Sequence, residues 1–432
     1  MQEVHTSMNE KTSKRPHVVI LGAGMGGVKA AQCFAGEPVD VTVVDQNNYQ
    51  FFAPLLYQLS TGILEESEIA LPVRQFFRSQ SNADFHLGCV TGFDTANKTV
   101  FTDTGDISYD YLIVALGSTT RYFGMKDIEE HSFPMKTLSE SAAIRDHIMR
   151  CIESAAHETD EEKKQALLTF IVVGGGPTGV EEAGAIAELL HNTLPPDYPR
   201  LDLKKADVKL IEMTDSLLMM MPMKLRESAA KSLRKKGVDV RLNTAVSNYD
   251  GETVTFKNNE TIKAHTLIWA SGVQAVDVCS KLGAKQAGDG RIIVGRDLSV
   301  PELPEVYVIG DCAHFIEKSG EPPLATIAPY AMQEAACAAH NIMCQIEGEP
   351  QKTFVSHDLG SMAMVGRFAG VMAKGSMTMD GFFAWAAWLA VHVIRLAGWT
   401  TNFIVLYKWL LNTLFSTRPA CLTSERDEAK TS

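Results

Sequence analysis

Two glycine-rich segments with the same spacing constrain the fold of this chain more than any other feature. Each follows a short apolar stretch, at 17–21 and 167–173, and each precedes a stretch of helical composition. The segments read Gly22-Ala23-Gly24-Met25-Gly26-Gly27 and Gly174-Gly175-Gly176-Pro177-Thr178-Gly179. A strand that turns through such glycines into a helix begins a βαβ unit that binds a dinucleotide. The sequence therefore predicts an α/β fold with two Rossmann-like domains.

The geometry of the loop explains why glycine is needed at each position of the motif. Gly22 makes the tight turn from strand to helix, Gly24 lets the backbone approach a pyrophosphate, and Gly27 lets the helix pack closely against the strand. Gly26 belongs to the same loop, and the helix that follows presents its positive dipole end to the phosphates. In the second segment we assign the same roles to Gly174, Gly176 and Gly179.

An acidic residue ends the second strand of each unit. Asp45 follows the apolar stretch 39–44, and Glu212 follows 208–211. A carboxylate at this position accepts hydrogen bonds from a ribose and repels a 2′-phosphate. Two dinucleotide sites in one chain indicate FAD in the first and a nicotinamide cofactor in the second, with NADH favoured over NADPH by Glu212. The alternative for Glu212 is a solvated surface acid.

Composition excludes several classes of function. The 432-residue chain carries a formal charge of -12, which argues against a nucleic-acid partner. Its eight cysteines have neither C-x-x-C nor metal-ligand spacing, so we expect reduced thiols and no metal. Residues 1–16 lack the apolar core of a signal peptide and are expected to form a disordered tail before the first strand, in a bacterial protein that faces the cytoplasm.

Three further segments resemble the two-dinucleotide flavoproteins, and each is an apolar strand that runs into a glycine. They are Tyr109–Gly117, Thr266–Val273 and Val306–Asp311. The resemblance implies that Gly117 and Gly272 lie where the chain crosses between the FAD and NADH domains. It also implies that Asp311, after Gly310, binds the ribityl chain of the flavin; the alternative is a turn residue that caps a strand.

Within that superfamily the chain most resembles the type II NADH dehydrogenases, which reduce quinone without pumping protons. Four segments carry this resemblance, at 48–58, 269–273, 358–367 and 381–392, and the match runs from about residue 17 to residue 417. The relatives of glutathione reductase place a pair of redox cysteines beside the flavin, typically spaced as C-x-x-C or C-x4-C. Neither spacing occurs in this sequence. The resemblance therefore implies an FAD-dependent NADH:quinone oxidoreductase in which electrons leave the flavin directly for a membrane quinone.

Two site assignments come from this resemblance. Glu181, near the start of the helix after the second glycine segment, occupies the position of a family acid close to nicotinamide and flavin, and it is our only catalytic candidate; otherwise it is an acid that favours the helix dipole. Many members line the quinone channel with Ala-Gln-x-Ala-x-Gln, whereas this chain has Pro329 at the first glutamine and Gln333 at the second. Both are quinone candidates, although Gln333 can equally be an ordinary polar helix position.

The carboxy-terminal region has a different composition. The apolar stretch 382–391 is too short to cross a bilayer. On one continuous helix, Trp388, His392, Arg395 and Trp399 share a face, which is typical of a helix at a membrane surface. A second helix over 403–415 brings Thr401, Lys408 and Asn412 together. We expect both helices to attach the enzyme to the cytoplasmic face of the bacterial inner membrane, and the alternative is a homodimer interface.

The expected organisation is discontinuous. We assign 17–125 and 272–350 to the FAD-binding domain, 126–271 to the NADH-binding domain, and 351–432 to a C-terminal domain whose membrane-associated helices cover 381–417. Two other functions stay open. One is a sulfide:quinone oxidoreductase using Cys151 and Cys337, and the other is a flavin-binding sensor without turnover.

Overall fold

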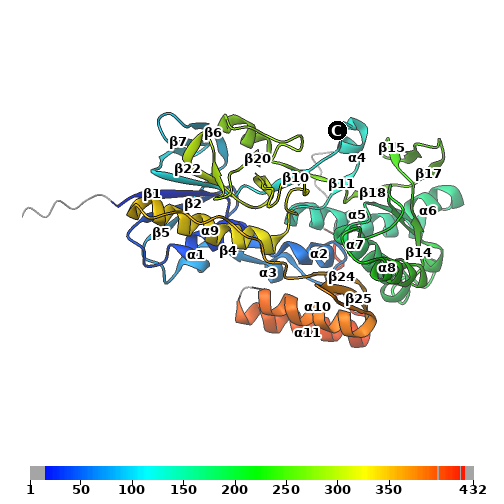
Figure 1. The fold of residues 1–432 in the computed structure, drawn as a ribbon. Coiled ribbons are helices and arrows are strands. Elements are labelled where there is room, and N and C mark those ends of the chain that lie inside the picture. Colours follow the sequence, from blue (N-terminus) through cyan, green and yellow to red (C-terminus); the bar gives the residue numbers. More distant parts are fainter. Residues whose placement is uncertain (1–14, 397, 419, 424–432) are drawn as a thin grey trace, which may run out of the picture. The chain divides into compact units, whose positions relative to one another are not determined.

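The computed structural model describes residues 15–396, 398–418 and 420–423 (Figure 1). The predicted tail 1–16 lies outside the described residues except for Arg15 and Pro16. The chain forms two compact units. The first contains the described residues up to Gln50, with Pro72–Ser118 and Ala275–Ser356. The second contains Phe51–Leu71, Thr119–Gln274 and the described residues from His357 onwards.

A parallel sheet forms the centre of the first unit. In spatial order its strands are β5 (Ala83–Leu87), β2 (Asp40–Asp45), β1 (His17–Leu21), β9 (Tyr111–Val114) and β22 (Leu303–Val308), with β21 (Ser299–Val300) antiparallel at the edge. Alternate residues of β1 enter two different cores: Val18 and Ile20 pack with residues of α1 (Met25–Cys33) and α9 (Ala328–Glu347), whereas Val19 and Leu21 pack on the opposite face. Burial of both faces explains the continuous apolar stretches of these strands.

The other elements of the first unit are short. A three-stranded antiparallel sheet contributes Val90 and Val100 to the second of these cores. The elements are β6 (Val90–Asp94), β7 (Thr99–Thr102), β8 (Gly105–Ser108), β20 (Ile292–Ile293), β23 (Ala313–His314), η2 (Val73–Phe77), η5 (Asp277–Leu282) and η6 (Gly310–Cys312). The chain passes from one unit to the other within four short strands, β3 (Tyr49–Phe51), β4 (Ala70–Pro72), β10 (Ser118–Thr120) and β19 (Val273–Ala275).

The second unit repeats the same sheet pattern. Its strands are ordered β14 (Val238–Arg241), β13 (Asp207–Ile211), β12 (Thr169–Val173), β18 (Thr266–Trp269) and β11 (Phe133–Pro134), all parallel. Helices α5 (Leu138–His157), α7 (Pro177–Glu188) and α8 (Met223–Lys235) contact this sheet. The small sheet of β15 (Val246–Tyr249), β16 (Thr253–Phe256) and β17 (Thr261–Lys263) packs on Ile171 and Val173 of β12. The predicted α/β fold with two Rossmann-like domains is confirmed.

Two local predictions in this unit need correction. The strand predicted over 167–173 begins at Thr169, because α6 (Glu161–Leu167) continues to Leu167. Asp160 starts that helix by accepting hydrogen bonds from the backbone N–H groups of Glu162 and Lys163. The surface loop predicted over 192–206 holds helical turns, η3 (Leu189–Thr193) and η4 (Leu203–Lys205), and it buries Leu201 and Leu203. Helix α4 (Lys126–His131) completes the elements of this part of the chain.

Segment 51–71 belongs to the second unit although the sequence places it inside the first glycine-motif domain. It forms η1 (Ala53–Leu55), α2 (Leu56–Ser60) and α3 (Glu66–Ile69). Helix α2 contacts both α5 and α7 (Figure 1). Its residues Leu56 to Ser60 are all buried, so this short helix is part of the core of the second unit.

The carboxy-terminal elements also pack into the second unit. They are β24 (Ser361–Gly366), β25 (Ala369–Lys374), β26 (Met377–Asp380), α10 (Gly381–Arg395) and α11 (Trp399–Phe415). Close backbone contacts hold them in place: a Cβ atom at Gly184 of α7 would lie 2.3 Å from the carbonyl oxygen of Val365, and one at Gly370 would lie 2.8 Å from the backbone nitrogen of Trp385. Among the described residues, no helix has the length and apolar character needed to cross a bilayer.

The aromatic face predicted for a single C-terminal helix is wrong. Helix α10 ends at Arg395 and Trp399 begins α11, with Gly398 between them at a φ of +91°. Trp388 and His392 point into the protein, where they are 1% and 9% exposed and their rings stack at 3.8 Å. A left-handed glycine breaks the helix, and burial of this aromatic pair contributes to the core.

Helix α11 turns polar side chains towards the protein and apolar side chains outwards, whereas a surface helix usually does the opposite. Thr401 is buried, and the Lys408 ammonium group contacts the carboxylates of Glu68 at 2.6 Å and Glu65 at 3.3 Å, at α3. Large apolar side chains on α10 and α11 instead face outwards, 45% to 80% exposed. They are Phe382, Phe383, Ile394, Phe403, Ile404, Leu406, Tyr407, Leu410, Leu414 and Phe415. We call this set the outer apolar face.

The inward ion pair predicts a stability effect. Replacing Lys408 with Met keeps the aliphatic stem but leaves the buried Glu68 carboxylate without its cation, and we expect the free energy of unfolding to fall by about 2 kcal/mol. Chemical denaturation measures this change. Lys318→Met is the matched control, because its pair with Glu321 is 3.6 Å long and exposed, and we expect a loss below about 0.5 kcal/mol. Equal losses in the two variants would contradict the role assigned to Lys408.

Candidate functional site

The first glycine loop joins β1 to α1 and has room only for glycine at two of its positions. Gly22 has a φ of +99°, and a Cβ atom there would lie 2.3 Å from the carbonyl oxygen of Ala115. A Cβ atom at Gly27 would lie 1.8 Å from the carbonyl oxygen of Gly22. At Gly24, in contrast, no atom lies within 4 Å, so the backbone is open to a ligand. Gly26 faces α9, with its nearest contact at 3.4 Å.

The second glycine loop, between β12 and α7, repeats this geometry. Gly174 has a φ of +119° and would place a Cβ atom 2.5 Å from the carbonyl oxygen of Ala270. A Cβ atom at Gly179 would lie 2.0 Å from the carbonyl oxygen of Gly174, and Gly176 is open. The two loops therefore present the same exposed backbone at a helix N-terminus, which is the arrangement that fits a pyrophosphate.

The strand-end acids bind across their glycine loops in the same way. Asp45 accepts hydrogen bonds from the backbone N–H groups of Ala23 at 2.7 Å and Asn47 at 2.8 Å. Burial raises the pKa of the Asp45 carboxyl group, although these backbone bonds oppose the shift. Glu212 accepts from the backbone N–H groups of Gly175 at 2.6 Å and Thr214 at 2.7 Å. Each carboxylate oxygen has a further lone pair for a ribose hydroxyl, so the residues fit FAD at the first site and NADH at the second.

The remaining cofactor candidates lie near these loops within their own units. In the first unit, Gly117 has a φ of +77° and no atom within 4 Å of its Cβ position, and the adjacent Ser118 hydroxyl donates to Asp311 at 2.5 Å. The N–H group of Gly310 donates to Glu334, a residue absent from our sequence assignments. In the second unit, the carbonyl oxygen of Gly272 accepts from the Arg121 N–H group at 3.2 Å.

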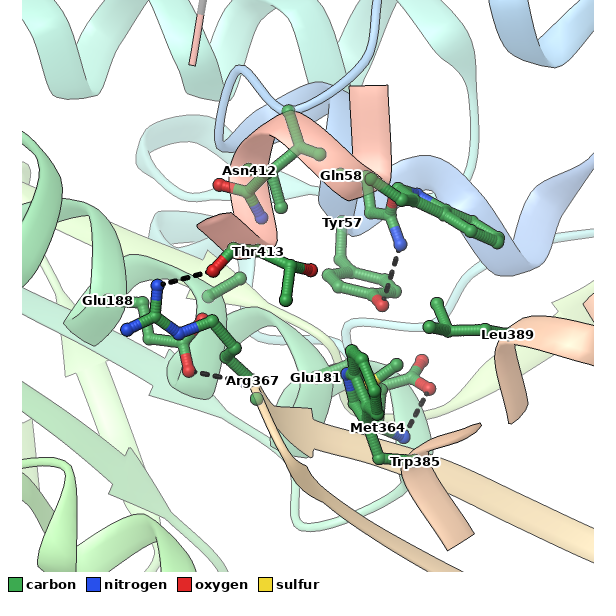
Figure 2. Close-up of a pocket in the computed structure, with 14 residues that line it drawn as sticks. Tyr57, Gln58, Glu181, Glu188, Met364, Arg367, Trp385, Leu389, Asn412 and Thr413 are labelled. Atoms are coloured by element: carbon green, nitrogen blue, oxygen red, sulfur yellow. Dashed lines mark hydrogen bonds between the residues drawn. The ribbon is translucent and has the colours of Figure 1, made fainter. Parts of the chain in front are cut away.

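A pocket in the second unit contains the catalytic candidate (Figure 2). Residues from five elements line it: Tyr57 and Gln58 of α2, Glu181 and Glu188 of α7, Met364 of β24, Trp385 and Leu389 of α10, and Trp409, Asn412 and Thr413 of α11. Its free volume is about 40 Å³, which is room for one or two water molecules. A larger ligand enters only if these side chains move apart.

Glu181 is buried in the wall of this pocket and is 9% exposed. Its carboxyl group accepts a hydrogen bond from the N–H group of Met364 at 2.9 Å and bonds to the side chain of Trp388. Burial raises its pKa to about 8 despite these bonds. The carboxyl group is therefore mostly protonated at neutral pH. The alternative role, an acid that favours the helix dipole, requires a charged carboxylate.

A second buried acid follows directly. Glu182 is fully buried, accepts a hydrogen bond from the Ser60 hydroxyl at 2.6 Å, and has its pKa raised to about 8 by burial. Arg418 lies nearby and donates to the carbonyl oxygens of Thr61 and Ala185. Burial also lowers the pKa of this guanidinium. Residues beyond α11 thus complete the core beside the pocket, so deletion of 381–432 would open that core as well as remove the helices.

The other end of the pocket is charged. Glu188 accepts hydrogen bonds from the Lys236 ammonium group and from the Arg367 N–H group, both at 2.6 Å. The Arg367 guanidinium donates to the Ser416 hydroxyl at 2.9 Å and to the Thr413 carbonyl oxygen at 3.2 Å (Figure 2). These bonds join α7, the β24–β25 turn and the end of α11 around the pocket.

The quinone candidates from the sequence belong to the first unit. Pro329 and Gln333 lie in α9, where the Gln333 amide donates to the Pro329 carbonyl oxygen at 3.1 Å. Neither lines the pocket of Figure 2, and their role stays a prediction.

Sequence reasoning missed most of the pocket. Tyr57 and Gln58 end the first segment that carried the family resemblance, but no role was assigned to them. A tyrosine and an amide inside an otherwise apolar stretch, 51–59, were the available signal. Arg367 ends another resemblance segment, 358–367, but was given no role. Glu188 gave no signal, because only the packing of β24 against α7 brings it to Arg367.

The two cysteines considered for sulfide chemistry, Cys151 and Cys337, are in settings that disfavour their thiolates. Cys151 is buried in α5 and bonds to His147 and Thr266, and burial raises its pKa to about 11. Burial likewise raises the pKa of Cys337 to about 11. Both thiols are therefore protonated and weakly nucleophilic. Cys279 and Cys312, although 33 positions apart and therefore outside any C-x-x-C spacing, form a buried hydrogen-bonded pair.

The geometry of Glu212 predicts the nicotinamide preference. In Glu212→Gln one side-chain oxygen can still accept from a loop N–H group, but the charge that repels a 2′-phosphate is lost. We expect the ratio of kcat/KM for NADPH to that for NADH to rise by about tenfold. Steady-state kinetics with both cofactors measure it, and Glu227→Gln, an exposed acid on α8, is the control. An unchanged ratio in Glu212→Gln would show that this acid does not select the cofactor.

Comparisons with known proteins show the family to which the chain belongs. A family model described as pyridine nucleotide-disulphide oxidoreductase matches residues 16–335. The type II NADH:quinone oxidoreductase Ndh of Mycobacterium tuberculosis is 36% identical over 435 residues, which cover 96% of this chain and 92% of that protein. NdhA of the same organism, also named a type II NADH:quinone oxidoreductase, is 34% identical and covers 91% of this chain and 86% of its own length.

Solved structures show the same fold. NDH2 of Plasmodium falciparum, in complex with NADH, has a TM-score of 0.86 at 20% identity and covers 94% of this chain and 99% of its own. The sulfide:quinone oxidoreductase of Aquifex aeolicus has a TM-score of 0.72 at 20% identity and covers 93% of this chain and 96% of its own. The chain belongs to the pyridine nucleotide-disulphide oxidoreductase family and, within it, to the type II NADH:quinone oxidoreductases.

Proposed function

We propose that this chain oxidises NADH and reduces a quinone, with FAD as its bound cofactor and without pumping protons. The duplicated glycine loop carries this proposal, because each copy combines an open backbone at a helix N-terminus with an acid for ribose. A bound flavin supplies the two-electron acceptor that links NADH oxidation to quinone reduction. Gly24, Asp45 and Asp311 hold FAD, while Gly176 and Glu212 hold NADH.

The pocket of Figure 2 is our proposed quinone site. Aromatic and apolar side chains line it between two polar ends, which suits a flat ring with oxygens on opposite sides. Its present volume requires Trp385, Leu389 or their neighbours to move when a ring enters. Pro329 and Gln333 remain proposed quinone contacts from the family pattern alone.

We assign Glu181 a role in supplying a proton for quinone reduction. Reduction of a quinone to a quinol by NADH consumes one proton from solvent for each turnover. Glu181 keeps a proton next to the pocket because burial raises its pKa to about 8. We propose that this carboxyl group donates that proton to a quinone oxygen and takes up another from solvent.

A sulfide:quinone oxidoreductase is the second candidate. The solved structure with TM-score 0.72 supports the shared fold only. The two cysteines considered for that chemistry carry protonated thiols, so we favour NADH as the electron donor.

We also propose that the enzyme attaches peripherally to the cytoplasmic face of the bacterial inner membrane through the outer apolar face. Ten large apolar side chains face outwards from α10 and α11 while Lys408 faces inwards. A quinone dissolves in lipid, so a bilayer is the surface that serves the reaction. A second copy of the chain is the competing occupant.

Replacement of Glu181 tests the proposed function. Wild-type protein should oxidise NADH when a short-chain quinone is added. Its kcat should fall as the pH rises through about 8, because the carboxyl group then loses the proton that it donates. In Glu181→Gln we expect a kcat at least about tenfold lower at neutral pH and no decline near pH 8. Reduction of the flavin by NADH should persist.

Three outcomes would contradict these assignments. Sulfide-dependent reduction of the flavin without NADH oxidation would support the second candidate. Flavin reduction without turnover on any quinone would indicate a sensor. A wild-type pH profile that Glu181→Gln leaves unchanged would remove Glu181 from proton transfer.

Vesicle flotation tests the attachment. In Phe403→Asp combined with Leu410→Asp, two charges would enter the apolar layer of the bilayer, so we expect bound protein to fall by about tenfold or more. Val355→Asp, at an exposed apolar position in the first unit, is the control and should bind as the wild type does. Unchanged flotation together with a change from dimer to monomer would assign the outer apolar face to a second copy.

A further inference from the structure

Three side chains of the proposed quinone pocket form a directed chain of hydrogen bonds. The indole N–H group of Trp409, on α11, donates to the side-chain oxygen of Gln58 at 2.6 Å. The amide N–H group of Gln58, on α2, donates to the phenolic oxygen of Tyr57 at 2.9 Å (Figure 2). All three residues line the pocket. They are 3% to 5% exposed, so little water competes for these bonds.

The chemistry of the first donor fixes the direction of the whole chain. An indole N–H group can only donate, so the oxygen of the Gln58 amide must face Trp409. The amide nitrogen must then face Tyr57, and it too can only donate. The phenolic oxygen of Tyr57 therefore accepts, and its own hydrogen must point elsewhere.

The pocket is where that hydrogen is available. Among the residues that the structure describes, none accepts a hydrogen bond from the Tyr57 hydroxyl. Burial, and then the nearby Glu181, raise the pKa of Tyr57 well above its ordinary value, so the phenol keeps its hydrogen. A buried donor without an acceptor is costly, and an oxygen atom of a ligand in the pocket would satisfy it.

We propose that Tyr57 donates a hydrogen bond to a quinone carbonyl oxygen in this pocket, and that Gln58 and Trp409 are positioning residues that keep its hydroxyl aimed there. This inference rests on the proposed function. Negative charge develops on that oxygen as electrons arrive, so a donor already in place favours reduction more than binding. Glu181 supplies a proton, whereas Tyr57 supplies a fixed hydrogen bond and loses no proton.

Tyr57→Phe tests the donor because it removes only the hydroxyl group. We expect kcat/KM for a short-chain quinone to fall by about tenfold, mostly through kcat. The rate of flavin reduction by NADH, followed separately by rapid mixing, should not change. Tyr198→Phe is the matched control: it also removes a hydroxyl group from the second unit, one that donates to Glu153 outside the pocket.

Trp409→Phe tests the positioning roles. Without the indole N–H group, the Gln58 amide can rotate so that its oxygen accepts a hydrogen bond from the Tyr57 hydroxyl. That hydroxyl is then no longer aimed at the quinone, so we expect kcat/KM for quinone to fall by about threefold to fivefold. In the Tyr57→Phe background the same change should have almost no further effect, because no hydroxyl remains to be aimed. A purely structural role of Trp409 would lower activity by the same factor in both backgrounds.

The outcomes separate this inference from the proposed function. If the wild type turns over quinone and Tyr57→Phe matches it, the donor role is wrong while the function stands. If Trp409→Phe acts equally in both backgrounds, the positioning role is wrong. If the wild type reduces its flavin with NADH but never reduces quinone, the proposed function fails, and the inference fails with it.

Discussion

The close approach of backbone to backbone at two glycine loops is the constraint on which the rest of this structure depends. At Gly22 and Gly174 a side chain would overlap the carbonyl oxygen of the residue that follows the neighbouring strand, and at Gly27 and Gly179 it would overlap the loop itself. Only glycine permits these contacts, and they bring each helix N-terminus to the end of its sheet. The strand-end acids then bond across the loops, so the same local geometry arises twice in one chain.

Burial of acidic groups explains the chemistry of the pocket. Glu181 and Glu182 are adjacent on α7, and burial raises the pKa of each to about 8. A protonated acid in an apolar wall can give a proton to a ligand without a strong charge being present beforehand. The C-terminal elements create this environment, because Trp388, Trp409 and Arg418 exclude water from the same region. The helices that present the outer apolar face therefore also complete the pocket.

The sequence allowed the fold and the two cofactor sites to be predicted because they depend on local spacing. Strand, glycines, helix and acid occur in order, and each part has its own physical signature in Gly22, Gly27 and Asp45. The pocket could not be predicted in this way. It depends on contacts such as that of the Arg367 backbone with Glu188, 179 positions apart, which no pattern along the chain encodes. The face predicted to hold Trp388 and Trp399 together is wrong for a related reason, since Gly398 separates these two residues into different helices.

Transfer of electrons from NADH to quinone through the flavin of one chain is the central claim, and anaerobic rapid mixing tests it most directly. The purified protein is mixed first with one equivalent of NADH and then with one equivalent of a short-chain quinone, while flavin absorbance is followed. We expect NADH to bleach the yellow flavin completely and the quinone to restore its colour. A protein without flavin, a flavin that NADH does not bleach, or a reduced flavin that quinone does not reoxidise would contradict the claim.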